Sequence, residues 1–253
     1  MSRTEKIVSS PCVKYLQWKN KYDENDLLVG GTFVYWDKDK EENVEIELPF
    51  KFAVLEPSMK TFKGYNEKRK SGVWSNEGKN PEHEITLRNK EGKLMSFKLG
   101  DYKKFKDEIN GHGAKYVSSV YIGVPTENGI EVWNLQIGGA VANGGSDPEE
   151  KDPSEKNDGW FSFVNRAKQE IYKRWIVVED VKKKKKGKTK FCIPIFTFGG
   201  LISDSDGSQL DTLDMELKDY FAYYFAKKPD AEEATQTTAP VDDNFDENEN
   251  YDN

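Results

Sequence analysis

The sequence predicts a mainly β protein, an antiparallel barrel with insertions that ends in a C-terminal helix. Aromatic residues make up 13% of the chain while hydrophobic residues as a whole make up only 36%, a balance that favours twisted sheets over a helical bundle. Apolar and polar residues alternate with period two in many short segments separated by turn residues. One late segment instead has apolar residues at helical spacing. A β-sandwich would show nearly the same pattern.

The first half of the chain contains most of the short alternating segments. We expect residues 1–31 to form an irregular lead-in with a short helix at Val13–Lys19. The alternation then predicts strands in this order: Thr32–Trp36, Val44–Leu48, Pro49–Leu55, Met59–Tyr65, Gly72–Ser75, His83–Arg88 and Leu94–Lys98.

The middle of the chain changes period twice. A short helix is expected over Asp101–Ile109, stopped by Gly111. Two strong strands follow, Lys115–Val124 and Ile130–Ile137, joined by a hairpin turn at Glu127–Gly129.

The last third is expected to hold a loop, a hairpin and two helices. Residues 138–157 are rich in Gly, Asp, Pro and Glu and predict a loop, and Trp160–Lys168 predicts a helix. A long hairpin, Tyr172–Val181 with Lys190–Phe198, surrounds a lysine-rich turn. The clearest helix is predicted to start at Ser208, with Asp211 completing a capping box, and to end before Pro229.

Charge divides the chain into a domain and a tail. The net charge is −7, but residues 229–253 hold nine acids and no base, which leaves 38 basic and 36 acidic residues elsewhere. We therefore predict one β-rich domain over residues 1–228 and a disordered acidic tail over residues 229–253.

The sequence lacks the patterns expected of an enzyme or a metal site. His83 and His112 have no metal-ligand spacing with Cys or carboxylates, and we expect both to be ordinary surface residues. No phosphate-binding loop or nucleophile elbow occurs, so neither catalysis nor a cofactor is expected. Cys12 and Cys192 are expected to be isolated thiols rather than a disulfide.

No targeting or membrane segment is recognisable. Residues 1–10 have no apolar core of the kind a signal peptide needs, and no apolar run approaches the ~20 residues that cross a bilayer. We expect a soluble protein of the cytoplasm, the host-cell cytoplasm if the source is viral. The sequence leaves the oligomeric state open, self-association included.

Aromatic and basic residues alternate on several predicted strands and turns. Single-stranded nucleic acid needs this combination, because exposed bases stack on aromatic rings while Lys and Arg follow the phosphates. The candidate nucleic-acid-binding residues are Tyr35, Trp36, Lys60, Lys63, Tyr65, Lys68, Arg69, Lys70, Trp74, Lys115 and Tyr116.

The same rings can also serve as core, because alternate residues of a strand face inward. We expect Phe33, Phe50, Phe52, Phe62 and Trp133 to be buried, whereas Trp36 and Trp74 have polar neighbours and could face either way. The lysine run of the late hairpin is most simply a solvated turn, with nucleic-acid contact as the alternative.

The tail can be a solubilising end or a mobile polyanion that imitates nucleic acid. In the second case it competes with DNA for the basic groove at low salt and, once released, recruits replication proteins. The tail residues expected to bind partners are Asp242, Asp243, Phe245, Asp246, Glu247 and Tyr251.

Several segments between residues 13 and 228 resemble the single-stranded-DNA-binding proteins of tailed bacteriophages. They are Pro49–Leu55, Lys63–Asn66, Ser71–Glu77, Gly113–Tyr116, Ser119–Tyr121, Trp160–Phe161, Lys190–Phe191 and Pro194–Phe196. The resemblance implies an oligonucleotide-binding-type barrel, cooperative coating of exposed strands in phage replication or recombination, and a C-terminal tail that contacts replication proteins. The alternative function is a virion or carbohydrate-binding β-module that uses Trp and Tyr as sugar platforms.

Overall fold

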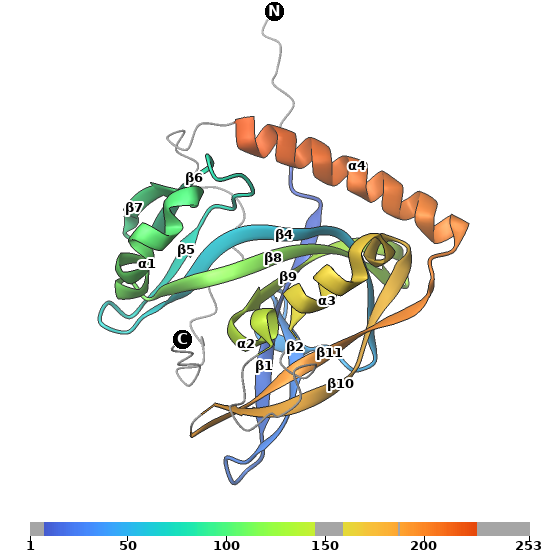
Figure 1. Cartoon of the computed structure of the whole chain (residues 1–253), viewed down its shortest axis with the longest axis horizontal. Helices are drawn as coiled ribbons and strands as arrows, with labels where there is room; N and C mark the ends of the chain where they lie inside the picture. Colours follow the sequence, from blue (N-terminus) through green and yellow to red (C-terminus); the bar gives the residue numbers. More distant parts are fainter. Residues whose placement is uncertain (1–7, 145–158, 187, 227–253) are drawn as a thin grey trace, which may run out of the picture.

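The computed structural model describes residues 8–144, 159–186 and 188–226. In these ranges the chain is mainly β, as the sequence predicts (Figure 1). The elements in chain order are β1 (Cys12–Tyr22), β2 (Leu28–Asp37), β3 (Glu42–Glu45), β4 (Phe50–Asn66), β5 (Ser71–Ser75), β6 (Glu84–Asn89), β7 (Gly92–Lys98), α1 (Tyr102–Gly111), β8 (Ala114–Thr126), β9 (Gly129–Gly138), α2 (Gly139–Asn143), α3 (Trp160–Ala167), β10 (Arg174–Lys186), β11 (Thr189–Leu201) and α4 (Asp204–Ala226).

The strands form one large mixed sheet that is not closed into a barrel. Its order is β3-β2-β1-β9-β8-β4-β5-β6-β7, and β10 branches from the first part of β4 and pairs with β11. Strands β1 and β9 are parallel, whereas the other described pairs are antiparallel. The long strands β4 and β8 form the middle of the sheet (Figure 1).

Strand β4 is longer than the sequence suggested, because Pro57 does not end it. We expected one strand before this proline and a second strand after it, but β4 continues from Phe50 to Asn66. Its pairing with β8 shifts register on both sides of Glu56. A bulge leaves one residue outside the ladder, so a proline without an N–H group is tolerated there.

The larger core lies where the sheet curls round on itself. It contains Phe33, Phe50, Phe52 and Trp133, all at most 6% exposed, together with Trp160 of α3. Between β11 and β1 the curl is joined by side chains instead of a strand ladder. Trp18 Nε1 donates to the Cys192 carbonyl oxygen at 2.8 Å, and the Cys192 N–H donates to Asn20 Oδ1 at 2.8 Å.

The smaller core packs α1 against β4–β7. Phe62 is fully buried there, with its ring centroid 5.3 Å from those of Phe97 and Tyr102. Phe105 and Ile109 of α1 pack in the same cluster. The five rings or side chains expected to be buried, Phe62 among them, are therefore confirmed as core.

Helix α4 covers part of the opposite face of the sheet. In Figure 1 it lies across one side of the molecule above β4 and β8. Leu217 packs there on Met59, Tyr121 and Val132. The helix begins four residues earlier than predicted, because Ser203 is its cap: the Asp206 N–H donates to Ser203 Oγ at 3.1 Å and the Ser203 hydroxyl donates to Asp206 Oδ2 at 2.8 Å.

Two further expectations about local structure are wrong. Val13–Lys19 is not helical but belongs to β1, because Leu16 reaches the large core while β1 pairs in parallel with β9. The expected loop at residues 138–157 begins with the short helix α2, and residues 145–158 lie outside the described residues.

Candidate nucleic-acid interface

A row of basic and aromatic residues crosses the sheet from β7 to β8. Cross-strand partners share a face of an antiparallel sheet. Lys63 of β4 lies opposite both Trp74 of β5 and Lys115 of β8. Trp74 in turn lies opposite Arg88, and Arg88 opposite Lys93. We call these five residues the basic row.

The basic row faces away from α1. Phe62 and Val73 are in the core under α1, and each precedes a row residue, so alternation puts Lys63 and Trp74 on the other face. Tyr65 follows Lys63 by two positions and lies on the same face. This is the face that α4 covers further along β4, at Met59.

The outer members of the row are accessible. Lys93 and Lys115 are exposed, while Trp74, Tyr65 and Arg88 are each partly exposed. Lys63 is enclosed more tightly, with its Nζ 5.7 Å from the centroid of the Tyr15 ring. Cationic groups beside half-exposed rings can contact phosphates and bases of one strand at the same time.

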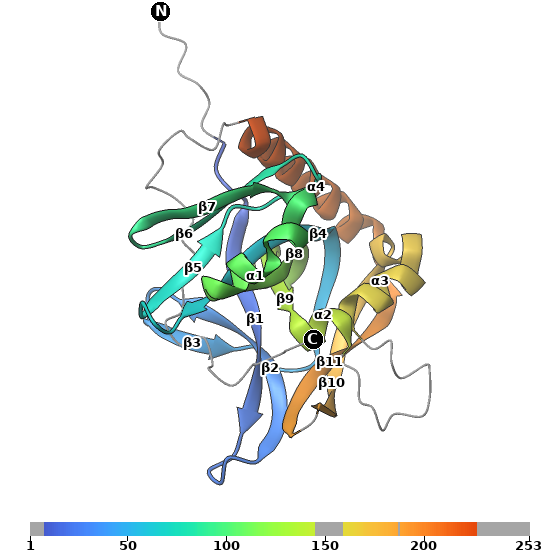
Figure 2. The same ribbon diagram turned by 60° about the vertical axis from the view of Figure 1, so that its left-hand side comes forward.

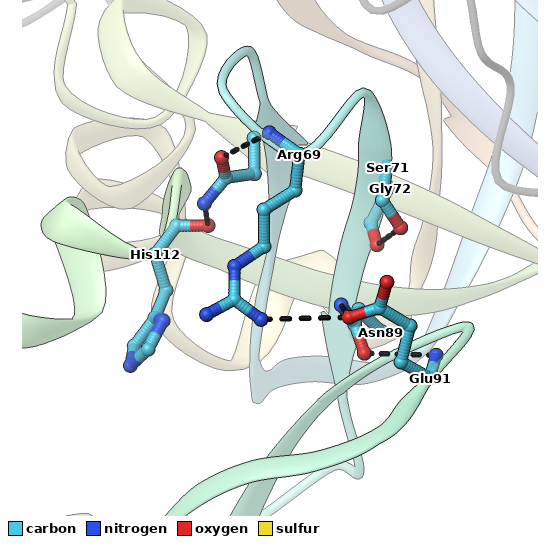
Figure 3. Close-up of polar contacts among 7 residues, drawn as sticks. Arg69, Ser71, Gly72, Asn89, Glu91 and His112 are labelled. Carbon is cyan, nitrogen blue, oxygen red and sulfur yellow. Dashed lines mark hydrogen bonds and ion pairs between the residues drawn. The ribbon is translucent and has the colours of Figure 1, made fainter.

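The predicted cations at positions 68 to 70 lie in the turn between β4 and β5, the two strands that carry Lys63 and Trp74. Figure 3 shows the polar contacts of Arg69 in this turn. Asn66 fixes this turn: its Oδ1 accepts from the Arg69 N–H at 3.0 Å, and its Nδ2 donates to the His112 carbonyl oxygen at 3.0 Å. The Arg69 guanidinium points to Glu91 in the β6–β7 turn, at 3.5 Å.

Acids beside this turn reduce its positive charge. Glu91 pairs with Arg69, and Glu67 lies 3.7 Å from Lys70 Nζ. Both pairs are solvent-exposed, so each contributes at most about 1 kcal/mol and yields readily to a competing phosphate. Lys68 is exposed as well. The turn therefore adds cations to the row without a rigid site for any one phosphate.

A partly buried acidic group, Glu77, lies between the basic row and α4. Glu77 accepts hydrogen bonds from Ser119 Oγ and, at 2.8 Å, from Tyr121 OH. Desolvation raises the pKa of Glu77, while these hydrogen bonds and the nearby Lys63 lower it. Desolvation lowers the pKa of Lys63 to about 8, and the negative charge of Glu77 opposes that change.

Other polar groups surround this carboxylate. Asn134 Nδ2 donates to Ser119 Oγ at 2.6 Å, and Asn134 Oδ1 is buried without a described partner. Burial raises the pKa of Cys12 to about 12 and raises that of Tyr15 further, so both remain protonated at neutral pH. The network is a fixed polar layer beneath Lys63, and it places the Glu77 carboxyl group close to the row.

The end of α4 reaches this layer. The Glu77 N–H donates to Tyr224 OH at 2.9 Å, and burial raises the pKa of Tyr220 to about 12. Helix α4 ends at Ala226. The described end of α4 therefore lies beside Glu77, close to the basic row.

The sequence analysis identified part of the residues on this face as candidates, among them Lys63, Trp74 and Lys115. Trp36 also belongs to this face. Along β1, Gln17 shares the face of Tyr15, and Val34 of β2 lies opposite Gln17. Trp36 follows Val34 by two positions and therefore points the same way. The residues that it missed are Tyr15, Glu77, Arg88 and Lys93. The signal for Arg88 and Lys93 was present, since they lie at the facing ends of the predicted strands His83–Arg88 and Leu94–Lys98, but the pairing of β6 with β5 is not visible in the sequence.

Three predicted residues lie on the other face. Tyr116 lies opposite Phe62 and packs in the core under α1, with its ring centroid 6.1 Å from that of Tyr102. Lys60 precedes Phe62 by two positions and shares that face. Tyr35 packs on the large core, 6.1 Å from the Trp133 ring. In each strand an odd number of positions separates the predicted residue from the face of the basic row, so its side chain points the other way.

The predicted tail residues lie outside the described residues: Asp242, Asp243, Phe245, Asp246, Glu247 and Tyr251. Cys12 and Cys192 are free thiols. Among the described residues, no three His, Cys, Asp or Glu side chains are grouped as metal ligands. In the same part of the chain, no helix combines the length and the apolar character that crossing a bilayer requires.

A cleft of about 770 Å³ lies beside α4, where the helix faces residues 55–58 of β4. Apolar side chains of α4, Leu217 and Phe221, form one wall. Lys79 and Glu56 on its rim pair with each other at 2.6 Å. The charges of the rim are therefore internally compensated, and we assign no ligand to the cleft.

Comparison with family models, with curated proteins and with solved structures finds no match for this chain. Its function is therefore inferred from the site itself.

Proposed function

We propose that this protein binds single-stranded DNA on the face of the sheet that carries the basic row. One observation carries the proposal: Lys93, Arg88, Trp74, Lys63 and Lys115 lie in register across five adjacent strands. The sequence separates them widely, yet the fold aligns them on one face. Tyr65 adds a second half-exposed ring beside Trp74.

The chemistry of this row suits a strand of any sequence. An unpaired base has two flat faces, and stacking on Trp74 or Tyr65 contributes about 1–3 kcal/mol per base. Lys93 and Lys115 flank these rings and can neutralise phosphates, with a log-salt slope of about 0.7 for each one. None of these contacts requires a particular base.

We further propose that the protein coats exposed strands during phage replication or recombination, in the host-cell cytoplasm. The acidic tail follows α4 in the sequence, and the described end of α4 contacts Glu77 beside the basic row. It is therefore placed to compete with DNA and, when displaced, to contact replication proteins through Phe245 and Tyr251. The resemblance of the sequence to bacteriophage single-stranded-DNA-binding proteins supports this assignment.

We also infer that the curled part of the sheet is a divergent oligonucleotide-binding barrel. Strands β1, β2, β4, β8, β9, β10 and β11 all contribute to the large core. A closed barrel would need a strand ladder between β11 and β1. There the side chains of Trp18 and Asn20 bond to the backbone of Cys192 instead. The basic row then lies mainly on the β4–β7 extension of this curl.

The test is a titration of labelled oligo-dT, followed by fluorescence anisotropy and Trp emission. Trp74→Ala is expected to raise the Kd between about 5-fold and about 150-fold, the equivalent of one stacked base. Lys115→Ala is expected to lower the log-salt slope by about 0.7. The matched control is Lys103→Ala with Lys106→Ala, which removes two charges from α1 on the opposite face.

Two results would reject this function. One is the absence of oligo-dT binding by the intact protein at low salt. The other is an equal loss of affinity in the control and in Trp74→Ala, because only the basic row should matter. Binding of a glycan without any salt dependence would instead support the carbohydrate-binding alternative.

A further inference from the structure

Two hairpins of opposite charge lie at the same end of the molecule. The turn between β1 and β2 and the turn between β10 and β11 are both at the bottom of Figures 1 and 2, away from α4. The two views differ by a rotation about the vertical axis, so both hairpins share this end in three dimensions. We call them the acidic hairpin and the lysine hairpin.

The lysine hairpin presents a cluster of exposed cations. Lys183, Lys185, Lys188 and Lys190 are all exposed. Lys185 lies opposite Lys190 in the ladder, and Lys183 lies opposite Cys192. These lysines therefore lie close together at the end of the hairpin, where their mutual repulsion is relieved by any approaching anionic group.

The acidic hairpin presents the complementary charge together with apolar surface. Glu24 and Asp26 are exposed at its turn, while Asp23 Oδ1 fixes the turn by accepting the N–H groups of Asn25 and Leu27, both at 2.9 Å. Leu27 is 59% exposed. Val29, two residues on, is 51% exposed. The aliphatic stems of lysines pack well on such side chains while their ammonium groups reach carboxylates.

The spacing between the hairpins is fixed by the fold. The bonds from Trp18 and Asn20 to the backbone of Cys192 tie β1 to β11 partway along both hairpins. The acidic hairpin cannot swing freely against the lysine hairpin of the same chain, because these contacts hold both strands. Because the charged side chains named above are exposed on both hairpins, each hairpin is accessible to a second molecule.

We propose that two copies of this chain pair at this end, the lysine hairpin of each against the acidic hairpin of the other. A two-fold axis between the hairpins makes both contacts at once, and such closed, self-complementary pairs are the commonest form of homo-oligomer. A DNA strand is the less suitable occupant, because phosphates on the lysine hairpin would approach the carboxylates of the neighbouring acidic hairpin. The proposal does not rest on DNA binding, because it concerns the free protein.

A charge-swap experiment tests the pairing by sedimentation velocity of the full chain without DNA. The lysine-hairpin variant carries Lys183→Glu, Lys185→Glu, Lys188→Glu and Lys190→Glu. The acidic-hairpin variant carries Glu24→Lys, Asn25→Lys and Asp26→Asn; Asn is chosen at position 26 because its φ of 56° tolerates Asn.

The unmodified protein is expected to sediment as a dimer at low salt and as a monomer at high salt, where the charges are screened. Each variant alone is expected to lose the dimer. An equimolar mixture of the two variants restores it, because each then offers the charge that the other lacks. This recovery also shows that both variants are folded.

Three outcomes would overturn the proposal. They are a monomeric unmodified protein at low salt, a dimer that survives in either single variant, and a mixture that stays monomeric. A lysine-hairpin variant that keeps its association state but loses oligo-dT affinity would identify the hairpin as a DNA contact instead. Association is measured without DNA, so a protein that does not dimerise can still bind DNA on the basic row. Equally, a protein that does not bind oligo-dT can still form the proposed dimer.

Discussion

At the scale of single residues, Lys63 is the most informative member of the proposed site. It lies between Trp74 and Lys115 in the basic row, and desolvation lowers its pKa to about 8. Glu77 keeps it from falling further, because a nearby negative charge favours the ammonium form. A lysine that titrates near physiological pH makes a pH-dependent contribution to any phosphate contact.

The first prediction follows from this pKa. Below about pH 8 Lys63 is charged and attracts phosphate; as the pH rises through 8 it becomes neutral, so affinity for oligo-dT should fall between about pH 7 and 9. The log-salt slope should decrease by about 0.7 over the same range. Anisotropy titrations at both pH values measure the change.

Lys63→Arg provides the control, because a guanidinium stays charged throughout this range. Its affinity is expected to be the same at both pH values. An identical fall in Lys63→Arg would assign the pH dependence to another group.

At the scale of elements, α4 shows how a local signal can be assigned to the wrong residue. Both Ser203–Asp206 and Ser208–Asp211 fit a capping box. The fold selects the first pair, because Leu210 is then already inside the helix and buried against Ala53 and Trp175. Ser208 instead donates to the Asp204 carbonyl oxygen at 2.9 Å, as a residue in a helix interior does.

The second prediction compares these two serines. Ser203→Ala removes the N-terminal cap and should lower the free energy of unfolding by about 1 kcal/mol. For a domain of this size that corresponds to a fall in Tm of about 2–4 °C. Ser208→Ala is the matched control and should change Tm little, as thermal unfolding by circular dichroism can show. An equal loss in both variants would contradict the assignment of the cap.

The strands show the same dependence on tertiary context. The sequence pattern correctly predicted β5, β6, β7, β8 and β9, and in β5, β6 and β7 one face lies in the core under α1. It failed for Val13–Lys19, where Leu16 and Trp18 lie two apart but the neighbouring Tyr15 and Gln17 are also partly buried. A strand covered on both faces loses its simple pattern.

At the scale of the whole molecule, the division of charge is the main feature. A domain with a small net positive charge carries a segment of nine acids and no base. That segment follows α4 in the sequence, and Tyr224 near the end of α4 contacts Glu77. A polyanion attached at this point has a high effective concentration for the cationic face.

The third prediction concerns this segment. A chain that ends at Lys228 should bind oligo-dT more tightly than the full chain at low salt, and the two should converge at high salt, where the competing attraction is screened. A full-length variant whose tail acids are replaced by Asn and Gln separates charge from length and should behave like the shortened chain. Equal affinities of all three proteins at low salt would exclude competition by the tail.

Composition and alternation were sufficient to determine the mainly β class, the buried aromatic residues and the concentration of acidic residues at positions 229–253. These properties depend on local periodicity and on the balance of apolar and charged residues, which are readable along the chain. Only the tertiary structure decided that the sheet stays open, that Pro57 lies within one strand, and that Arg88 and Lys93 join Lys63 while Tyr116 and Lys60 turn away. Strand pairing over long sequence distances sets the register, and a shift of one residue moves a side chain to the other face.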